Sequence, residues 1–415
     1  MSKYESMRLF SMQHGGVRSA AVQEELQRRL QGGGAFVFPL RVNGYNTFVA
    51  LCPELLELIG SIYVKHLKLV RFSAKLRKEI LYHANASAML EEIQQSNEYE
   101  GVSSTRREIR AAMDDVGQER SDKRFFGMVR KYNMLLGSDE IPLRTSTDIR
   151  RLYDEFVLDE VVRENPKNAP DGVIFRVSQA EVVSPHEQTI HVGVSPETKV
   201  IEAMDQALSV LNDPRIDLLI RAAVFHYMFC YIHPFYDGNG RMDRFISSYV
   251  LSDIYEKSAC LRMAYIIKSH RSTYERMFRE ANDERSMGDL TRFVIEFLRF
   301  FEEAIDDAHS TLTECGAAHS AAEYALEVVI TRVNPRLKPY RFLLRRMILT
   351  TLFGHADLDV RQIALSTKSS EKRVRRALDQ CGDLVKRKKD GRKYVWCIDL
   401  QALTDAAMNA MPETE

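Results

Sequence analysis

The residues best suited to chemistry lie in one short stretch, HPFYDGNGRMDR, which runs from His233 to Arg244. His233 follows the nearly all-apolar run Leu218 to Ile232 and precedes Pro234. Because proline disfavours the α conformation in the residue before it, this run should form a buried helix that ends at His233. The sequence therefore predicts an imidazole at the mouth of a loop.

The residues after this loop are suited to binding an anion. Gly238, Asn239 and Gly240 open a second predicted helix, which runs from Arg241 to Tyr255. Glycines at a helix N-terminus let consecutive backbone N–H groups converge on an anion, and the helix dipole adds partial positive charge there. We therefore predict a phosphate-binding turn.

Three charged side chains complete the predicted site. Arg241 and Arg244 are three residues apart, so both can reach successive phosphates of one ligand. Two cations in a first helical turn oppose the helix dipole unless an anion binds there. Asp237 is a hard oxygen ligand suited to Mg²⁺. A helix-capping histidine or a Gly-Asn-Gly turn alone is an ordinary structural feature, but the combination indicates a nucleotide polyphosphate site.

This stretch resembles the complete signature of Fic domains, HPFx(D/E)GNGRxxR. The resemblance covers about residues 90 to 305 and implies a helical enzyme that transfers AMP from Mg-ATP to a Ser, Thr or Tyr hydroxyl of a protein, itself included. The roles that it implies are general base for His233, Mg²⁺ ligand for Asp237, phosphate binding for Gly238, Asn239 and Gly240, inner-phosphate contact for Arg241 and γ-phosphate contact for Arg244.

Further along the chain, Arg271-Ser272-Thr273-Tyr274 and Asn282 resemble the segment that lines the adenine and ribose pocket of Fic proteins. Glu275 stands where the family often has a second tyrosine. For Tyr274, a place in the hydrophobic core is an equally good interpretation. The two β-branched runs between Phe175 and Val194 predict a hairpin in the place of the family's flap, whose edge can hold a target segment by β-augmentation.

An inhibitory segment is indicated upstream of these residues. Ser96-Asn97-Glu98-Tyr99-Glu100-Gly101 resembles the (S/T)xxxE(G/N) motif of autoinhibited Fic proteins. The resemblance implies that Glu100, with Ser96, pairs with Arg244 and repels the γ-phosphate. A helix that ends at Gly101 explains the same residues structurally and is compatible with this role. In some relatives the glutamate helps water remove AMP, so a de-AMPylating hydrolase is an alternative.

The elements expected to position these residues give a mainly α fold: a Fic-type helical bundle with a β-hairpin flap, and a C-terminal winged helix-turn-helix. Helical spacing is seen over Ala21 to Leu30 and from Pro53 to about Ser96, and Asn43-Gly44 lies between two apolar runs typical of a hairpin. We divide the chain into an N-terminal region ending in the inhibitory helix (1–110), a Fic catalytic core (111–305), a helical linker (306–335) and the winged helix-turn-helix domain (336–415).

The C-terminal segment is strongly basic. Between Arg361 and Trp396 twelve Lys or Arg residues face four acids, a net charge of +8. The pattern predicts helices over Tyr340 to Leu352, Val360 to Ser366 and Ser370 to Gln380, then a hairpin around Asp390-Gly391. This order resembles a winged helix-turn-helix, which binds either DNA or protein.

Composition sets limits on the remaining interpretations. The 415 residues carry 58 basic and 58 acidic side chains, and the hydrophobic share of 45% is typical of a globular protein. The start MSKYESMRLF lacks a signal-peptide core and no apolar run is long enough to span a membrane, so we expect a cytoplasmic protein with no membrane partner. The six cysteines show no Cys-x-x-Cys pair, no His cluster has zinc spacing, and we interpret the cysteines as reduced, inert thiols.

Two other functions are weighed against protein AMPylation. One is a transcription regulator whose Fic core senses nucleotide with little turnover, although a pure sensor would not need His233. The other is a kinase, which is disfavoured because related kinases typically depart from the Gly-Asn-Gly-Arg sequence. The target protein, the modified residue type and homodimer formation are left open by the sequence.

Overall fold

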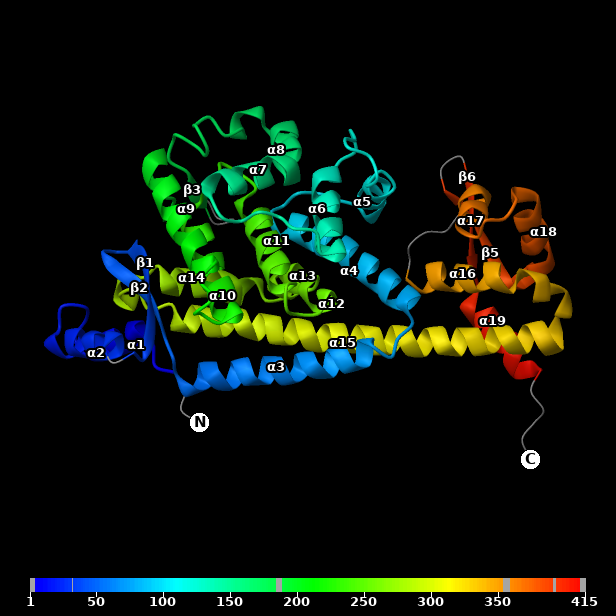
Figure 1. Ribbon diagram of the computed structural model, residues 1–415, viewed down its shortest axis with the longest axis horizontal. Helices are drawn as coiled ribbons and strands as arrows, with labels where there is room; N and C mark the ends of the chain where they lie inside the picture. Colours follow the sequence, from blue (N-terminus) through cyan, green and yellow to red (C-terminus); the bar gives the residue numbers. More distant parts are fainter. Residues whose placement is uncertain (1–3, 32, 184–188, 354–358, 391–392, 411–415) are drawn as a thin grey trace. The chain divides into compact units, whose positions relative to one another are not determined.

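The structure is a computed structural model that describes residues 4–31, 33–183, 189–353, 359–390 and 393–410. The chain divides into two compact units (Figure 1). The first unit comprises Met1–Val70 and Met89–Asp307, and the second comprises Arg71–Ala88 and Ala308–Glu415. Helices dominate both units, which confirms the mainly α fold class.

The N-terminal elements lie in the first unit, where several of them form a small apolar cluster with Met287. They are α1 (Met7–Gln13), α2 (Ala20–Leu30), β1 (Ala35–Val42), β2 (Tyr45–Ala50) and α3 (Pro53–Ser73). The hairpin predicted around Asn43-Gly44 is confirmed, since Val42 pairs with Tyr45 and both turn residues have positive φ. Met7, Val22 and Phe48 are fully buried in the cluster.

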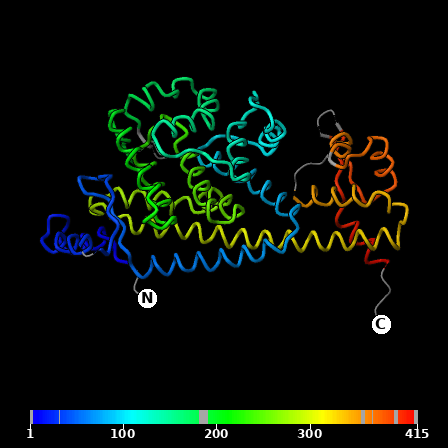
Figure 2. The backbone as a smooth tube through the Cα atoms, viewed as in Figure 1, coloured from blue at the N-terminus to red at the C-terminus, as the bar shows by residue number. Residues whose placement is uncertain are grey.

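The rest of the first unit is a helical bundle with one short hairpin. Its elements are α4 (Lys78–Tyr99), α5 (Arg106–Met113), α6 (Phe126–Gly137), α7 (Ser146–Phe156), α8 (Leu158–Glu164), β3 (Glu181–Val183), β4 (Thr189–Val192), α9 (Glu197–Leu211), α10 (Leu218–Ile232), α11 (Asn239–Leu251), α12 (Lys257–Cys260), α13 (Met263–Ser269), α14 (Arg271–Ala281) and α15 (Thr291–Val328). Helices α4 and α15 each contribute residues to both units. Helix α10 is apolar on all sides and is therefore buried between its neighbours. Helix α11 lies beside it (Figures 1 and 2).

Two predicted boundaries need correction. The helical stretch from Pro53 to about Ser96 is two helices, α3 and α4, although the intervening residues 74–77 contain neither glycine nor proline to signal the break. The helix predicted from Arg241 to Tyr255 is α11, which begins two residues earlier and ends at Leu251. The predicted hairpin between Phe175 and Val194 is present as β3 and β4, and its loop at 184–188 lies outside the described residues.

The second unit has its own apolar core. After a π-helical turn, Val329–Val333, and a 3-10 segment, Pro335–Tyr340, its elements are α16 (Arg341–Leu352), α17 (Val360–Ser366), α18 (Glu371–Cys381), β5 (Val385–Asp390), β6 (Lys393–Ile398) and α19 (Leu400–Asn409). The three predicted helices and the hairpin appear in the predicted order, with Gly391 of the predicted turn outside the described residues. Helix α19 has no counterpart in the sequence analysis. The winged helix-turn-helix assignment and the fourfold division of the chain stay predictions.

Two expectations from composition can be compared with the structure. Within the described ranges, no helix combines the length and the apolar character needed to cross a membrane. No disulfide joins any of the six cysteines, all of which belong to the described residues.

The first unit contains a helical glycine whose replacement tests its packing. A Cβ at Gly127 of α6 would lie 2.4 Å from the carbonyl oxygen of Glu155 in α7. We expect Gly127→Ala to destabilise the protein by roughly 1–3 kcal/mol, because the two helices must separate. Gly60→Ala in α3 is the control, since nothing lies within 4 Å of its Cβ position and alanine favours a helix. Thermal unfolding measures both, and an unchanged melting temperature for Gly127→Ala would contradict this close approach.

Candidate active site

His233 lies where the sequence analysis expects it, at the C-terminal end of α10. Its backbone N–H donates to the carbonyl of Phe229 at 2.9 Å, and its φ and ψ of 53° and 63° are left-handed. Pro234 follows and cannot continue the helix. The chain therefore turns sharply at this histidine.

A buried arginine that the sequence analysis missed fixes this turn. The Arg176 side chain is fully buried, and among the described residues it donates to backbone carbonyls alone. Its acceptors are His233 at 2.8 Å, Ser178 at 2.7 Å, Val194 at 2.9 Å and Ile232 at 3.4 Å. One guanidinium thus connects the end of α10 to residues on both sides of the hairpin formed by β3 and β4. The local signal is a charged residue inside the apolar run Val173 to Val177.

The surroundings of His233 set its protonation state. Burial, together with the nearby Arg176 guanidinium and His191 ring, lowers the pKa of His233 to about 4. The imidazole is therefore neutral at pH 7. A neutral imidazole can accept a proton, which is what a general base requires.

The predicted phosphate-binding turn begins α11. Gly238 is its N-cap and has a φ of 82°, which favours glycine. The Asn239 side chain accepts from the N–H of Phe235 at 3.0 Å and donates to the carbonyl of the same residue at 2.8 Å. Asn239 therefore holds the shape of the turn through its side chain.

Arg241 is fully buried and incompletely paired. Its Nη2 lies 3.3 Å from Oδ1 of Asp237, whereas Nε and Nη1 are buried without a hydrogen-bond partner among the described residues. Buried polar groups are nearly always paired in folded proteins. The unsatisfied guanidinium therefore indicates a place for an anion beside the turn.

Asp237 has the chemistry of a Mg²⁺ ligand. Its Oδ1 accepts from the N–H of Gly238 at 2.5 Å, and its side chain is 32% exposed. A partly exposed carboxylate beside a phosphate-binding turn suits a hard cation that phosphate oxygens and water also hold. The residues present therefore fit this metal.

The predicted contact between the inhibitory segment and the second arginine is present. Arg244, at 1% exposure, donates from Nη2 to Oε1 of Glu100 at 2.8 Å and from Nε to Oγ of Ser96 at 3.0 Å. The Tyr99 ring covers the same guanidinium at 4.9 Å. Burial acts to lower the pKa of Arg244, but the Glu100 carboxylate together with Tyr274 and Tyr99 outweighs it, and the net shift is upward.

The Glu100 carboxylate also reaches the phosphate-binding turn. A Cβ built on Gly240 would lie 2.1 Å from Oε1 of Glu100. An acidic side chain thus occupies the space next to the first turn of α11. This is the region where helix N–H groups favour an anion.

Seven of the predicted site residues line a cavity of about 170 Å³. The predicted site residues on its wall are Glu100, His233, Asn239, Gly240, Arg244, Tyr274 and Asn282. Ser96, Asp237, Gly238 and Arg241 do not line it. Residues on the wall that the sequence analysis did not single out include Tyr99, His191 and Cys230.

Tyr274 and Asn282 both make specific hydrogen bonds. The Tyr274 hydroxyl lies 2.7 Å from Nε2 of His226, and Oδ1 of Asn282 accepts from the Tyr227 hydroxyl at 2.7 Å. His226 is fully buried.

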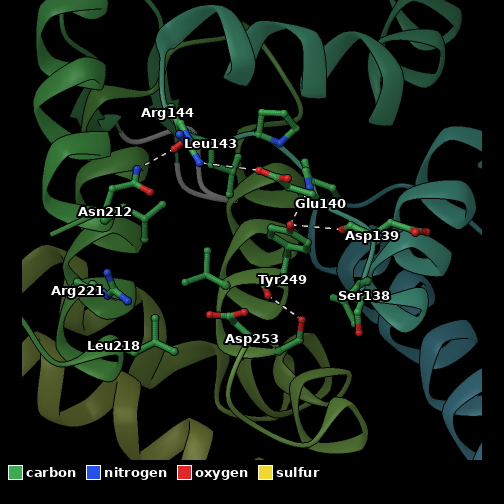
Figure 3. A pocket seen from close by; sticks show the side chains of 16 residues that line it. Ser138, Asp139, Glu140, Leu143, Arg144, Asn212, Leu218, Arg221, Tyr249 and Asp253 are labelled. Atoms are coloured by element: carbon green, nitrogen blue, oxygen red, sulfur yellow. Dashed lines mark hydrogen bonds and ion pairs between the residues drawn. The ribbon is translucent and has the colours of Figure 1, made fainter. Parts of the chain in front are cut away.

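A larger cavity, of about 490 Å³, lies elsewhere in the first unit (Figure 3). Asn212 and Arg221 line one side of it, and Tyr249 and Asp253 line another. None of the predicted site residues lines this cavity. Size alone therefore does not identify the site.

Known proteins resemble the part of the chain that holds the hairpin of β3 and β4 and the turn at Gly238. Residues 145–251 match the model of the Fic/DOC family. This part of the chain is therefore similar to Fic domains. The protein adenylyltransferase fic-1 of Caenorhabditis elegans is 28% identical over 131 residues, which are 30% of this chain and 25% of that protein. The chain thus matches about a quarter of this relative's length.

Solved Fic proteins also resemble the chain. A Fic family protein from Desulfovibrio desulfuricans G20 is 18% identical, with 84% of this chain and 96% of that chain covered and a TM-score of 0.49. A fragment of C. elegans Fic-1 is 21% identical, with 62% and 74% covered and a TM-score of 0.43. The matched range 145–251 includes His233 of the Fic domain, whereas Ser96 and Glu100 lie before it.

The pKa of His233 can be measured directly. We expect NMR of histidine-labelled protein, assigned with His233→Ala, to show a ring that stays neutral down to about pH 5, because its pKa is about 4. Arg176→Met should raise this pKa, since it removes a positive charge. Arg221→Met, at the larger cavity, is the matched control and should leave it unchanged. A His233 pKa near the ordinary 6.5 in the wild type would contradict the assigned environment.

Proposed function

We propose that this protein is a Mg-ATP-dependent protein adenylyltransferase whose Fic domain is restrained by Glu100. The observation that carries the proposal is the fully buried Arg241, whose Nε and Nη1 have no partner in the described part of the chain. It lies in the first turn of α11, beside a glycine-rich turn that favours phosphate. The similarity of residues 145–251 to Fic domains and of part of the chain to an adenylyltransferase supports AMP as the transferred group.

In the proposed reaction, the target hydroxyl attacks the α-phosphorus of ATP. His233 accepts the hydroxyl proton, the new O–P bond forms, and the bond between the α-phosphorus and the β-bridging oxygen breaks to release pyrophosphate. Arg241 and the N–H groups of the turn would hold the inner phosphates and offset the charge that develops on them. Arg176 keeps His233 in place through the backbone.

Mg²⁺, when bound, would neutralise phosphate charge, and Asp237 is the residue that would hold it. Its position immediately before the turn places the carboxylate next to the proposed phosphates. Arg241 Nη2 shares that carboxylate at 3.3 Å, so the same two side chains would organise metal and phosphate together.

The restraint is proposed to be electrostatic and steric. While Arg244 is paired with Glu100, it is not available to a γ-phosphate, and the carboxylate repels that phosphate. The Ser96 hydroxyl and Tyr99 ring hold the arginine in the same arrangement. ATP would therefore bind poorly or in a position unsuited to in-line attack.

Labelled ATP tests this function. We expect Glu100→Gly to raise transfer of α-phosphate label to protein by roughly 5- to 150-fold over the wild type, the range of a 1–3 kcal/mol coupling. Glu98→Gly is the matched control, because Glu98 lies in the last turn of α4, two residues before Glu100, but pairs with Lys268. His233→Ala in the Glu100→Gly background should lower transfer by roughly 10²–10⁴-fold.

The same experiment separates the alternatives. Label from the γ-phosphate only would indicate a kinase. If neither the wild type nor Glu100→Gly transferred label from either position, a nucleotide-sensing regulator would be favoured. Loss of AMP removal in Glu100→Gly, together with a gain of transfer, would add a de-AMPylating activity that depends on Glu100. Equal transfer by the wild type and Glu100→Gly would refute the restraint.

A second proposed function, DNA binding, rests on the exposed face of α18. Lys372, Arg375, Arg376 and Asp379 recur at helical spacing and are all exposed. On the following hairpin, Arg387 lies over the Tyr394 ring at 4.2 Å. Three cations on one short helix face suit the phosphates and base edges of a major groove.

Salt dependence distinguishes DNA binding from protein contact. We expect duplex DNA to bind with an affinity that falls as salt rises, and Arg376→Gln and Lys372→Gln each to lower the slope of log affinity against log salt by about 1. Lys199→Gln, on an exposed position of α9 in the first unit, is the control. No measurable duplex binding at low salt would leave protein contact as the function of this surface.

A further inference from the structure

Four polar side chains from two packed helices converge beneath the wall of the cavity of about 170 Å³ that His233 lines. His226 and Cys230 are four residues apart on α10, and Asp243 and Ser247 are four residues apart on α11. Side chains at this spacing lie on one face of a helix. Each helix therefore presents two donors to the other, which is how metal sites are built in helical bundles.

The donor atoms are close enough to share one ion. Oδ2 of Asp243 lies 3.1 Å from Nδ1 of His226 and 2.9 Å from Sγ of Cys230. The nitrogen, sulfur and oxygen donors all lie within 4.8 Å of one another. The Ser247 hydroxyl is 2.9 Å from the same Nδ1. An ion with bonds of about 2.0 Å to nitrogen and oxygen and 2.3 Å to sulfur can be accommodated by small movements of these side chains.

One atom of the cluster lacks a partner. Asp243 is fully buried, and its Oδ1 accepts no hydrogen bond from the described residues. A buried carboxylate is costly unless it is paired or coordinates a metal. Cys230 as a thiolate and Asp243 as a carboxylate would together balance a divalent cation, so the loaded site would carry no net charge.

We propose that His226, Cys230 and Asp243 form a Zn²⁺-class metal site, separate from the Mg²⁺ position at Asp237. A thiolate sulfur and an imidazole nitrogen select a borderline-soft ion over Mg²⁺. Binding breaks the S–H bond of Cys230, forms bonds from the ion to sulfur, nitrogen and oxygen, and releases the thiol proton to solvent. The ion enters through the cavity, whose wall includes Cys230.

Neighbouring residues provide the support that a metal-bound histidine needs. If Nδ1 of His226 binds the ion, Nε2 carries the proton and donates to the Tyr274 hydroxyl at 2.7 Å. The ion would cross-link α10 to α11, the helices that carry His233 and Arg244. Metal occupancy would therefore stabilise the packing beneath the active site, whether or not the Fic domain transfers AMP.

Cobalt substitution in the untagged full chain tests the site. After chelator treatment, the wild type should bind one equivalent of Co²⁺, with a near-ultraviolet thiolate-to-cobalt band and visible bands that Zn²⁺ abolishes. Cys230→Ser should lose the thiolate band, and Tyr274→Phe should weaken binding roughly 10-fold through the loss of its contact with His226. Cys52→Ser, which removes another partly exposed thiol outside the cluster, is the matched control and should behave as the wild type.

A second measurement needs no variant. X-ray absorption of the Zn²⁺-loaded wild type should show one sulfur neighbour at about 2.3 Å and nitrogen or oxygen neighbours at about 2.0 Å. Zinc binding should also release at least one proton per chain at pH 7. A shell without sulfur, or a cobalt thiolate band that survives Cys230→Ser, would overturn the proposal.

Discussion

The buried ion pair between Arg244 and Glu100 connects segments that lie 144 residues apart in the chain. An arginine at 1% exposure needs a counter-charge, and here the counter-charge comes from the end of α4. Ser96 adds both a hydroxyl and a carbonyl to the same guanidinium, the latter at 2.9 Å. The charge of Arg244 is therefore balanced by the protein itself, and a phosphate that approaches this arginine must compete with a carboxylate already in place.

Arg241 and Arg244 differ in how completely their guanidinium groups are paired. Both are buried in the same helix, but Arg241 shares only a long contact with Asp237 and keeps two nitrogens unpaired within the described structure. The unpaired nitrogens favour anion binding, whereas the paired Arg244 is restrained. The proposed enzyme would thus retain part of its phosphate affinity while the position for the outermost phosphate is occupied by Glu100.

The end of α10 shows a second way in which buried charge organises the fold. Within the part of the chain that the structure describes, Arg176 donates to four backbone carbonyls and to no carboxylate. Carbonyl groups at a helix C-terminus carry partial negative charge, so they stabilise the cation while it holds the flap and His233 together. The same positive charge helps to keep His233 neutral. The packing of the β3–β4 hairpin therefore affects the protonation of the imidazole.

The sequence alone determined the features that depend on neighbouring residues. An apolar run before Pro234 predicts the exit of α10 at His233, Asn43-Gly44 predicts the first hairpin, and the spacing of apolar residues predicts most of the helices. The twelve-residue stretch and the segment around Glu100 also carry the candidate site, because their residue types are informative at fixed spacing. These are properties of local backbone preference and of short motifs.

Tertiary structure decided the features that depend on packing between distant segments. The break between α3 and α4 has no glycine or proline to mark it, and the acceptors of Arg176 are backbone carbonyls, which leave no trace in the sequence. No spacing of residues along the sequence indicates the proposed zinc site, because Cys230 and Asp243 belong to different helices. They meet only because α10 packs on α11. A linear pattern records which donors are present, but only the fold determines which of them share one buried space.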